Sequence, residues 1–219
     1  MTSVTAPSAT EAPRADGPRE LTQRPLQLQG SRIARALLRL AGWQLQWDGL
    51  PGPQGVVVVY PHTSNWDFVV GILAKWAIGL PATFLGKHSL FGVPLFGRWL
   101  RWLGGRPVLR SAPQGVVGQM AQQLRDAREA GQFMWLVLAP EGTRGWRPGW
   151  RSGFYRVALE AGVPVALVRL DFAHRRVGFD SFWTLSGDLG ADFATFARRF
   201  ADCRGYHPQL AAPVRPLPP

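Results

Sequence analysis

The chain has 219 residues, of which 46% are apolar and only 18% are charged, so it can bury one substantial core. Its net charge of +11, in which only Lys75 and Lys87 are lysines, favours anionic partners: phosphorylated substrates, an acidic membrane surface or nucleic acid. The single cysteine, Cys203, excludes an internal disulfide and a cysteine-based zinc cluster, and no metal site is expected.

The N-terminal region is predicted to have two parts. Residues 1–30 are rich in Pro, Ala, Thr and charge and lack the apolar run of a signal peptide, so we expect a disordered tail. Residues 31–47 should form a helical entry to the domain, with Ser31 as a possible cap. Its apolar residues recur at helical spacing: Ile33, Leu37, Leu40 and Ala41. This N-terminal amphipathic helix fits either a membrane surface or the core.

The body of the chain should be a single domain over residues 31–205. Strands are expected over residues 55–60, 82–86, 106–109, 133–139, 163–170 and 176–179. Helices are expected over residues 66–78, 89–103, 113–130, 152–161 and 191–203. This alternation predicts an α/β fold with a mostly parallel central sheet flanked by helices. The proline-rich residues 206–219 should have no fixed structure.

A histidine and an aspartate follow the valine-rich strand over residues 55–60. His62 should emerge at the carboxyl edge of the sheet, where open α/β sheets keep their sites. Asp67, in the first turn of the next helix, could accept the imidazole Nδ1 proton and leave Nε2 free to take a proton. The pair is a candidate base with its orienting carboxylate, although such spacing also occurs in an ordinary capped helix.

Three further blocks follow strands or turns. Residues 140–144 (Pro-Glu-Gly-Thr-Arg) offer a guanidinium, a hydroxyl and backbone N–H groups suited to an anion. Residues 104–111 bring Arg110 to the same sheet edge if the strands are parallel. Residues 161–168 predict a core strand entered through a tight turn.

Taken together and in this order, these blocks resemble the glycerophospholipid acyltransferase superfamily over residues 55–170. Residues 62–67 match its histidine-x4-aspartate motif, in a His-Thr-Ser-Asn-Trp-Asp form similar to a bacterial branch. The resemblance implies that His62 and Asp67 are catalytic, with His62 as the general base. It implies that Arg110 and Arg144 hold an acceptor's phosphate, with Glu141, Gly142 and Thr143 shaping that pocket. Lys87 is a further basic residue near the site.

The resemblance also implies the substrates and the location. The acyl donor would be acyl-CoA or acyl carrier protein, the acceptor a lyso-glycerophospholipid such as 1-acylglycerol-3-phosphate, and no cofactor is required. An anionic membrane surface is the expected partner, at the cytoplasmic side of the cell membrane, and nucleic acid is not. No stretch of the chain reaches the roughly 20 apolar residues that span a bilayer, so this contact should be peripheral.

Two features leave the substrate open. Leu109 stands where many relatives carry an acidic residue before the second-block arginine, so the acceptor headgroup is not fixed. The Trp-, Phe- and Leu-rich stretch over residues 89–103 fits either a groove for an acyl chain, or for lipid, or buried core.

Two other functions compete with acyl transfer. The positive charge and interleaved Arg and Trp residues also suit a non-enzymatic module that binds anionic membrane or nucleic acid. A lipid or thioester hydrolase with Ser64 as nucleophile is the other, but the chain has no Gly-x-Ser-x-Gly elbow.

Overall fold

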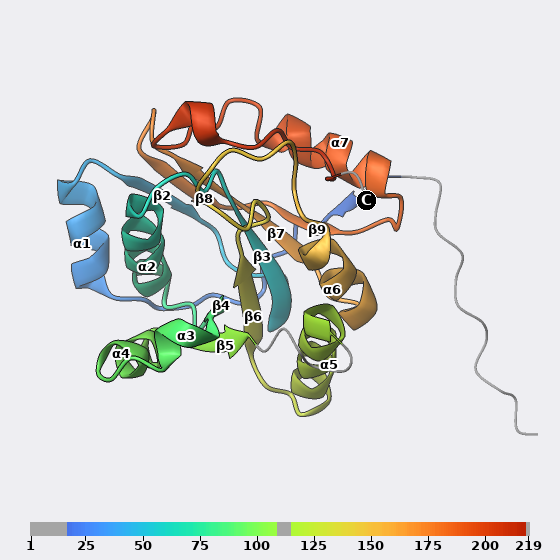
Figure 1. Ribbon diagram of the computed structural model, residues 1–219, viewed down its shortest axis with the longest axis horizontal. Helices are drawn as coiled ribbons and strands as arrows, with labels where there is room; N and C mark the ends of the chain where they lie inside the picture. Colours follow the sequence, from blue (N-terminus) through green and yellow to red (C-terminus); the bar gives the residue numbers. More distant parts are fainter. Residues whose placement is uncertain (1–16, 109–114, 218–219) are drawn as a thin grey trace, which may run out of the picture.

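The computed structural model describes residues 17–108 and 115–217, which form a sheet with helices on both faces (Figure 1). The strands are β1 (Arg19–Glu20), β2 (Gln44–Trp47), β3 (Gln54–Tyr60), β4 (Thr83–Lys87), β5 (Gly105–Val108), β6 (Met134–Leu138), β7 (Val165–Asp171), β8 (Arg176–Phe179) and β9 (Phe182–Thr184). The helices are α1 (Arg32–Leu40), α2 (Trp66–Ile78), α3 (His88–Phe91), α4 (Phe96–Trp102), α5 (Gly115–Glu129), α6 (Gly153–Ala161), α7 (Leu189–Arg199) and the short 3₁₀ helix η1 (Pro208–Leu210). The predicted α/β fold with a mostly parallel central sheet is confirmed.

The sheet has a parallel centre and antiparallel strands at one side. Its main path runs β1-β9-β7-β3-β6-β4-β5, with β8 beside β7 and β2 beside β8. Strand β3 is parallel to β6 and β7, and β4 is parallel to β5 and β6. Strands β8 and β9 run antiparallel to β7. The carboxyl ends of β3 and β6 therefore meet at one edge, which brings the loops that follow these two strands together.

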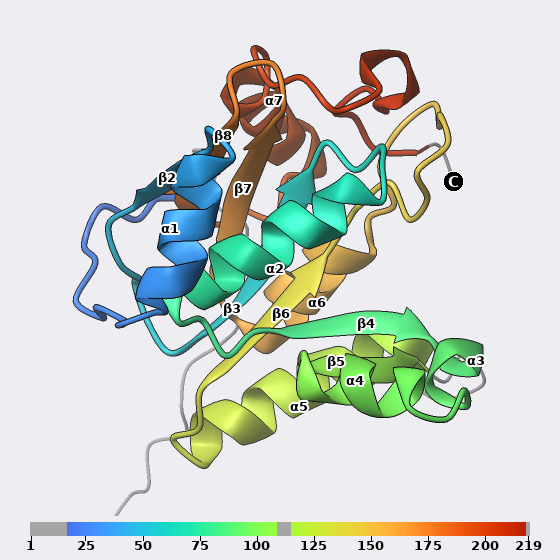
Figure 2. The ribbon, with the colours of Figure 1, turned by 90° about the vertical axis from the view of Figure 1, so that its left-hand side faces the viewer.

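Strand β3 separates two layers of core. Its side chains alternate, so Val56 and Val58 pack with residues of α5, α6 and α7, whereas Val57 and Val59 pack with residues of α1 and α2. Complete burial of a valine or leucine side chain stabilises the fold by about 1.5–3 kcal/mol, so the apolar run of β3 supports both layers. The two layers lie on opposite sides of the sheet (Figures 1 and 2).

Helix α1 begins where the sequence predicts, and Ser31 Oγ accepts the N–H of Ala34 at 3.2 Å. Its buried residues are Ala34 and Leu38, in a core cluster shared with α2. The stripe read from the sequence faces outward instead: Ile33, Leu37 and Leu40 are 74%, 48% and 84% exposed. The predicted helical entry over residues 31–47 is wrong beyond the helix end, because residues 44–47 are β2 and pair with β8.

The apolar stretch over residues 89–103 is two short helices, α3 and α4, not one. Helical structure is interrupted before α4 at Leu95, whose φ of 64° is not that of a right-handed helix. Phe91, Leu100 and Leu103 are buried, whereas Leu95, Phe96, Trp99 and Trp102 are exposed. The core interpretation is therefore right for the first three, and the other four remain candidates for contact with lipid. None of the helices in the described part of the chain has the length and apolar content needed to cross a membrane.

The described parts of the two expected tails, residues 17–30 and 206–217, are ordered against the domain. Residues 17–30 lie along the domain: β1 pairs with β9, and Leu26 bridges to Leu50. Residues 1–16 and 218–219 lie outside the described residues. The proline-rich end, residues 206–217, is held by hydrogen bonds between Trp150 and both Arg215 and Leu217, each 2.8 Å long. Composition misled the prediction because these segments are held by backbone hydrogen bonds, which leave no periodic apolar pattern.

Candidate active site

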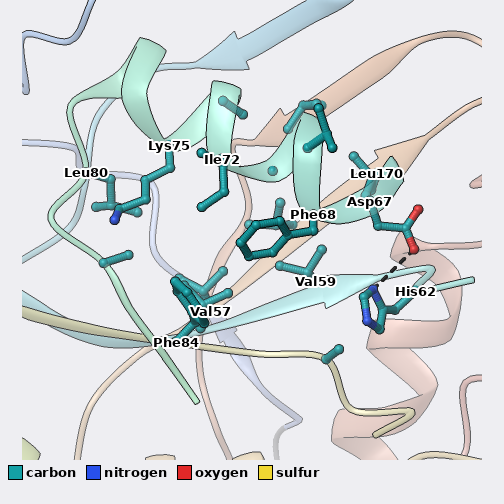
Figure 3. A pocket seen from close by; sticks show the side chains of 18 of the residues that line it. Val57, Val59, His62, Asp67, Phe68, Ile72, Lys75, Leu80, Phe84 and Leu170 are labelled. Carbon is teal, nitrogen blue, oxygen red and sulfur yellow. Dashed lines mark ion pairs between the residues drawn. The ribbon is translucent and has the colours of Figure 1, made fainter. Parts of the chain in front are cut away.

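The loop from β3 to α2 brings His62 and Asp67 together (Figure 3). Asp67 Oδ2 lies 3.2 Å from His62 Nδ1 and also accepts the backbone N–H groups of Thr63 at 2.6 Å and Ser64 at 2.8 Å. The Asp67 side chain is 1% exposed, whereas that of His62 is 21% exposed. The carboxylate is thus fixed by the backbone of the loop that carries the histidine, while the imidazole remains reachable by a substrate.

Ser64, the alternative nucleophile, serves the start of α2. Its Oγ accepts the N–H of Trp66 at 3.2 Å, and the residue is buried. Among the described residues, no hydrogen bond joins Ser64 Oγ to His62. This local hydrogen bond stabilises the turn that enters α2, and the placement does not provide the nucleophile–base contact that a hydrolase needs.

Glu141, in the loop after β6, is buried behind His62. Its Oε2 accepts the N–H of His62 at 2.6 Å, and its Oε1 accepts the N–H of Ala212 at 2.9 Å. Burial raises the pKa of Glu141 to about 7, and the Asp67 carboxylate adds to this rise while the two N–H donors oppose it. Both carboxylate oxygens are occupied by backbone donors, so they face the protein interior and not a ligand.

Arg144 joins the loop after β6 to the loop after β3. Its Nε donates to the carbonyl oxygen of Ser64 at 3.1 Å, and the residue is exposed. Within residues 17–108 and 115–217, no carboxylate forms an ion pair with Arg144. The remaining guanidinium nitrogens are therefore positioned beside the His62 loop and are suited to an anionic ligand.

The other residues predicted for the site have different placements. Gly142 has a φ of 67°, and a side chain there would meet the Arg151 side chain at 3.1 Å. Thr143 Oγ1 accepts the N–H of Gly145 at 3.3 Å, so it supports its own loop. Lys87 is the last residue of β4, and Arg110 lies outside the described residues. Arg151, which was not predicted for the site, is an exposed second guanidinium close to Gly142, and it does not line the cavity described below.

An elongated apolar cavity of about 610 Å³ lies between α2 and the sheet. His62, Asp67 and Arg144 line it, together with apolar residues of β3, α2, β7 and α4. Figure 3 shows His62 and Asp67 at one end, Phe68 and Ile72 along the middle, and Lys75 and Leu80 at the other end. Burial lowers the pKa of Lys75, whose ammonium donates to the Leu103 carbonyl. The catalytic candidates therefore face a long apolar space, and part of its wall comes from the stretch over residues 89–103.

A second histidine–aspartate pair lies at the turn after β7. His174 Nδ1 is 2.6 Å from Asp171 Oδ2, and the His174 side chain is 55% exposed. Neither residue lines the apolar cavity. The described residues contain no cluster of three or more His, Cys, Asp or Glu side chains arranged to hold a metal ion.

Comparison with known proteins bears on the family of the chain. A search of curated proteins found no match. Among solved structures, PlsC, the 1-acyl-sn-glycerophosphate acyltransferase of Thermotoga maritima, is similar with 20% identity and a TM-score of 0.42 over 63% of this chain. That match spans about half, 54%, of the PlsC chain. The model of the Acyltransferase family matches residues 46–170, which is more than half of the 219 residues and runs from β3 through all but the last residue of β7. The chain therefore belongs to the Acyltransferase family.

Proposed function

We propose that this acyltransferase moves a fatty acyl group from acyl-CoA or acyl carrier protein to the hydroxyl of a lyso-glycerophospholipid such as 1-acylglycerol-3-phosphate. The observation that carries the proposal is the placement of His62, Asp67 and Arg144 on one elongated apolar cavity. A base, an anion-binding guanidinium and space for an aliphatic chain are the three features that this reaction needs.

His62 acts as the general base. Asp67 holds Nδ1, so Nε2 takes the proton of the acceptor hydroxyl as its oxygen attacks the thioester carbonyl carbon. The tetrahedral oxyanion then collapses, the carbon–sulfur bond breaks, and the thiolate leaves with the proton from the His62 imidazolium. Such a base contributes about 10²–10⁴-fold to the rate, and alignment of the two substrates supplies much of the rest.

The cavity accommodates the acyl chain. Its walls are almost entirely apolar, and it begins beside the residue that would activate the hydroxyl. Burial of each methylene group in such a space is worth about 0.8 kcal/mol, so a fatty acyl chain gains affinity along its whole length. Arg144 holds the acceptor's phosphate, since its guanidinium lies beside the His62 loop.

The protein works at an anionic membrane surface, which it contacts with an exposed apolar face built from α1, α2, α3 and α4. These elements lie on one side of the sheet (Figure 2). The exposed apolar side chains of this face are Ile33, Leu37, Leu40, Trp76, Leu90, Val93, Leu95, Phe96, Trp99 and Trp102. Exposed arginines on the same helices, Arg32, Arg39 and Arg98, complement lipid phosphates. Leu90, Phe96 and Trp99 also line the cavity, so an acyl chain has a continuous apolar route from the membrane.

The direct test is acyl transfer by the purified full chain. The protein is incubated with palmitoyl-CoA or palmitoyl-acyl carrier protein and a panel of lysophospholipids, and the products are identified by mass spectrometry. Formation of phosphatidic acid or another diacyl phospholipid supports the proposal. Release of free fatty acid without any acylated acceptor would indicate a hydrolase, and salt-sensitive lipid binding without turnover would indicate a binding module.

A further inference from the structure

The C-terminal strap, which we define as residues 203–217, crosses the back of the catalytic loop. The His207 N–H donates to Thr63 Oγ1 at 3.1 Å, one residue from His62. Gly205 approaches the same loop so closely that an added side chain would meet Thr63 Oγ1 at 2.7 Å and Pro61 at 3.1 Å. The strap and the His62 loop are therefore in direct contact, although about 140 residues separate them in the sequence.

Glu141 connects the strap to His62 itself. One carboxylate oxygen accepts the N–H of His62 and the other accepts the N–H of Ala212 in the strap. The carbonyl of the same Ala212 accepts the O–H of Tyr60 at 2.9 Å, and Tyr60 is the last residue of β3, two residues before His62. Both backbone polar groups of Ala212, its N–H and its carbonyl, are thus bound by side chains close to His62.

The strap is also fastened to the loop that carries the phosphate-binding arginine. Trp150 exchanges backbone hydrogen bonds of 2.8 Å with Arg215 and Leu217, and Arg215 Nε donates to the Pro148 carbonyl at 2.8 Å. Trp150 is fully buried, so these bonds are shielded from water. The strap therefore contacts both loops at the carboxyl edge of the sheet, the one that carries His62 and the one that carries Arg144.

We propose that Glu141 and the C-terminal strap are positioning elements of the active site, which together hold the backbone of His62 where its imidazole can reach the acceptor hydroxyl. Glu141 does not touch substrate in this account; it acts through His62 and Ala212. The proposal rests on the proposed function, because it assigns a role within the same reaction. Displacement of a catalytic group by about 1 Å can cost about 100-fold in rate. Loss of the contacts that hold the His62 backbone should therefore lower turnover strongly.

The experiment compares three substitutions in the full-length chain. Glu141→Gln keeps the shape but turns one acceptor into a donor that faces an N–H group. Ala212→Pro removes the strap's N–H and leaves the Glu141 charge in place, and Ala212→Gly is its matched control because it keeps the N–H. Tyr60→Phe, which removes the second tether of Ala212, serves if Ala212→Pro does not fold. For each variant we would measure kcat and KM, the thermal unfolding midpoint and the NMR chemical shifts of the His62 ring at one fixed pH.

We expect Glu141→Gln and Ala212→Pro each to lower kcat by about 10–100-fold with little change in KM. The double variant should lose no more than the more damaged single variant, because both substitutions break one connection. The His62 ring resonances should move in Ala212→Pro and not in Ala212→Gly, because only the first substitution removes the N–H group that Glu141 binds. Unchanged kcat in both variants, or an equal loss in Ala212→Gly, would overturn the proposal. If the wild-type chain acylates none of the acceptors, the proposed function fails, and the chemical shifts of the His62 ring alone still decide whether the strap positions this residue.

Discussion

Asp67 Oδ2 lies 3.2 Å from His62 Nδ1 and simultaneously accepts the N–H groups of Thr63 and Ser64. One carboxylate oxygen therefore closes the loop between β3 and α2 and fixes the imidazole tautomer. Asp67 can reach His62, five residues earlier, because it lies in the first turn of α2, close to the end of β3. The proposed catalytic pair is a local structure, whereas the apolar cavity and Arg144, which we propose bind the substrates, come from parts of the chain that are distant in sequence.

Arg144→Ala should weaken binding of the acceptor more than it slows the chemical step. One charge-assisted hydrogen bond to a phosphate contributes on the order of 1.5–3 kcal/mol, which corresponds to a rise in the acceptor's KM of about 10–100-fold. The control is Arg147→Ala, since Arg147 is also exposed and lies in the same loop. Steady-state kinetics with varied lysophospholipid would separate the two, and an equal effect at both positions would contradict the assignment of Arg144.

Gly71→Leu should shorten the acyl chains that the enzyme accepts. Gly71 lines the cavity from α2, and no heavy atom lies within 4 Å of where its side chain would begin. The added side chain thus occupies space that an acyl chain would use. Gly71→Ala, the matched control, should keep the chain-length profile and stabilise the helix by about 0.5–1 kcal/mol. Rates with acyl donors of increasing length measure the effect; identical profiles for Gly71→Leu and wild type would exclude the cavity as the acyl site.

Membrane binding should depend on the exposed residues of α1. A double substitution, Ile33→Glu with Leu40→Glu, replaces two outward-facing apolar groups by charges that anionic lipid repels. We expect reduced co-sedimentation with phosphatidylglycerol vesicles and unchanged thermal stability. Leu159→Glu, on α6 at the other face of the sheet, should have no effect on vesicle binding (Figure 1). Equal loss of binding in the two proteins would contradict the assigned face.

Glu141 should make the stability of the protein depend on pH. Its pKa of about 7 lies above the value of about 4.3 for an unfolded glutamate, so the folded protein holds the proton more tightly. This stabilisation is fully present below about pH 4.3 and is lost as the pH rises through about 7. Relative to Glu141→Gln, the free energy of unfolding of the wild type should therefore fall by on the order of 3 kcal/mol between these values. Urea unfolding followed by tryptophan fluorescence measures the difference, and a pH-independent difference would refute the assignment.

The sequence predicted the parts of the molecule that are governed by apolar periodicity. The run Val56 to Val59 and the helix after it follow from alternation and from turn residues, and both were located within a few residues of their observed positions. The direction in which α1 faces could not be predicted, because Ala34 and Leu38 form a second, less apolar stripe whose small alanine allows close packing. A helical pattern does not distinguish a core from a bilayer.

No pattern in the sequence indicated the strap or the contacts of Glu141 with His62 and Ala212. Ala212 contributes a backbone N–H, which every residue except proline carries, and its contact with Glu141 spans 71 positions of chain. The extent of the cavity was equally hidden: the stretch over residues 89–103 was a candidate for an acyl groove, but the side chains of β3, α2 and β7 that complete the cavity were predicted only as parts of core strands and a helix. Long-range backbone contacts and empty space are properties of the folded arrangement.

The central claim, that His62 is the general base, is tested most directly by comparing His62→Ala with His174→Ala. Both histidines contact an aspartate, at 3.2 and 2.6 Å, but only His62 lines the apolar cavity. In an assay with palmitoyl-CoA and 1-acylglycerol-3-phosphate, we predict that His62→Ala lowers kcat by at least about 100-fold while the protein remains folded, and that His174→Ala retains wild-type activity. Full transfer activity in folded His62→Ala would contradict the account.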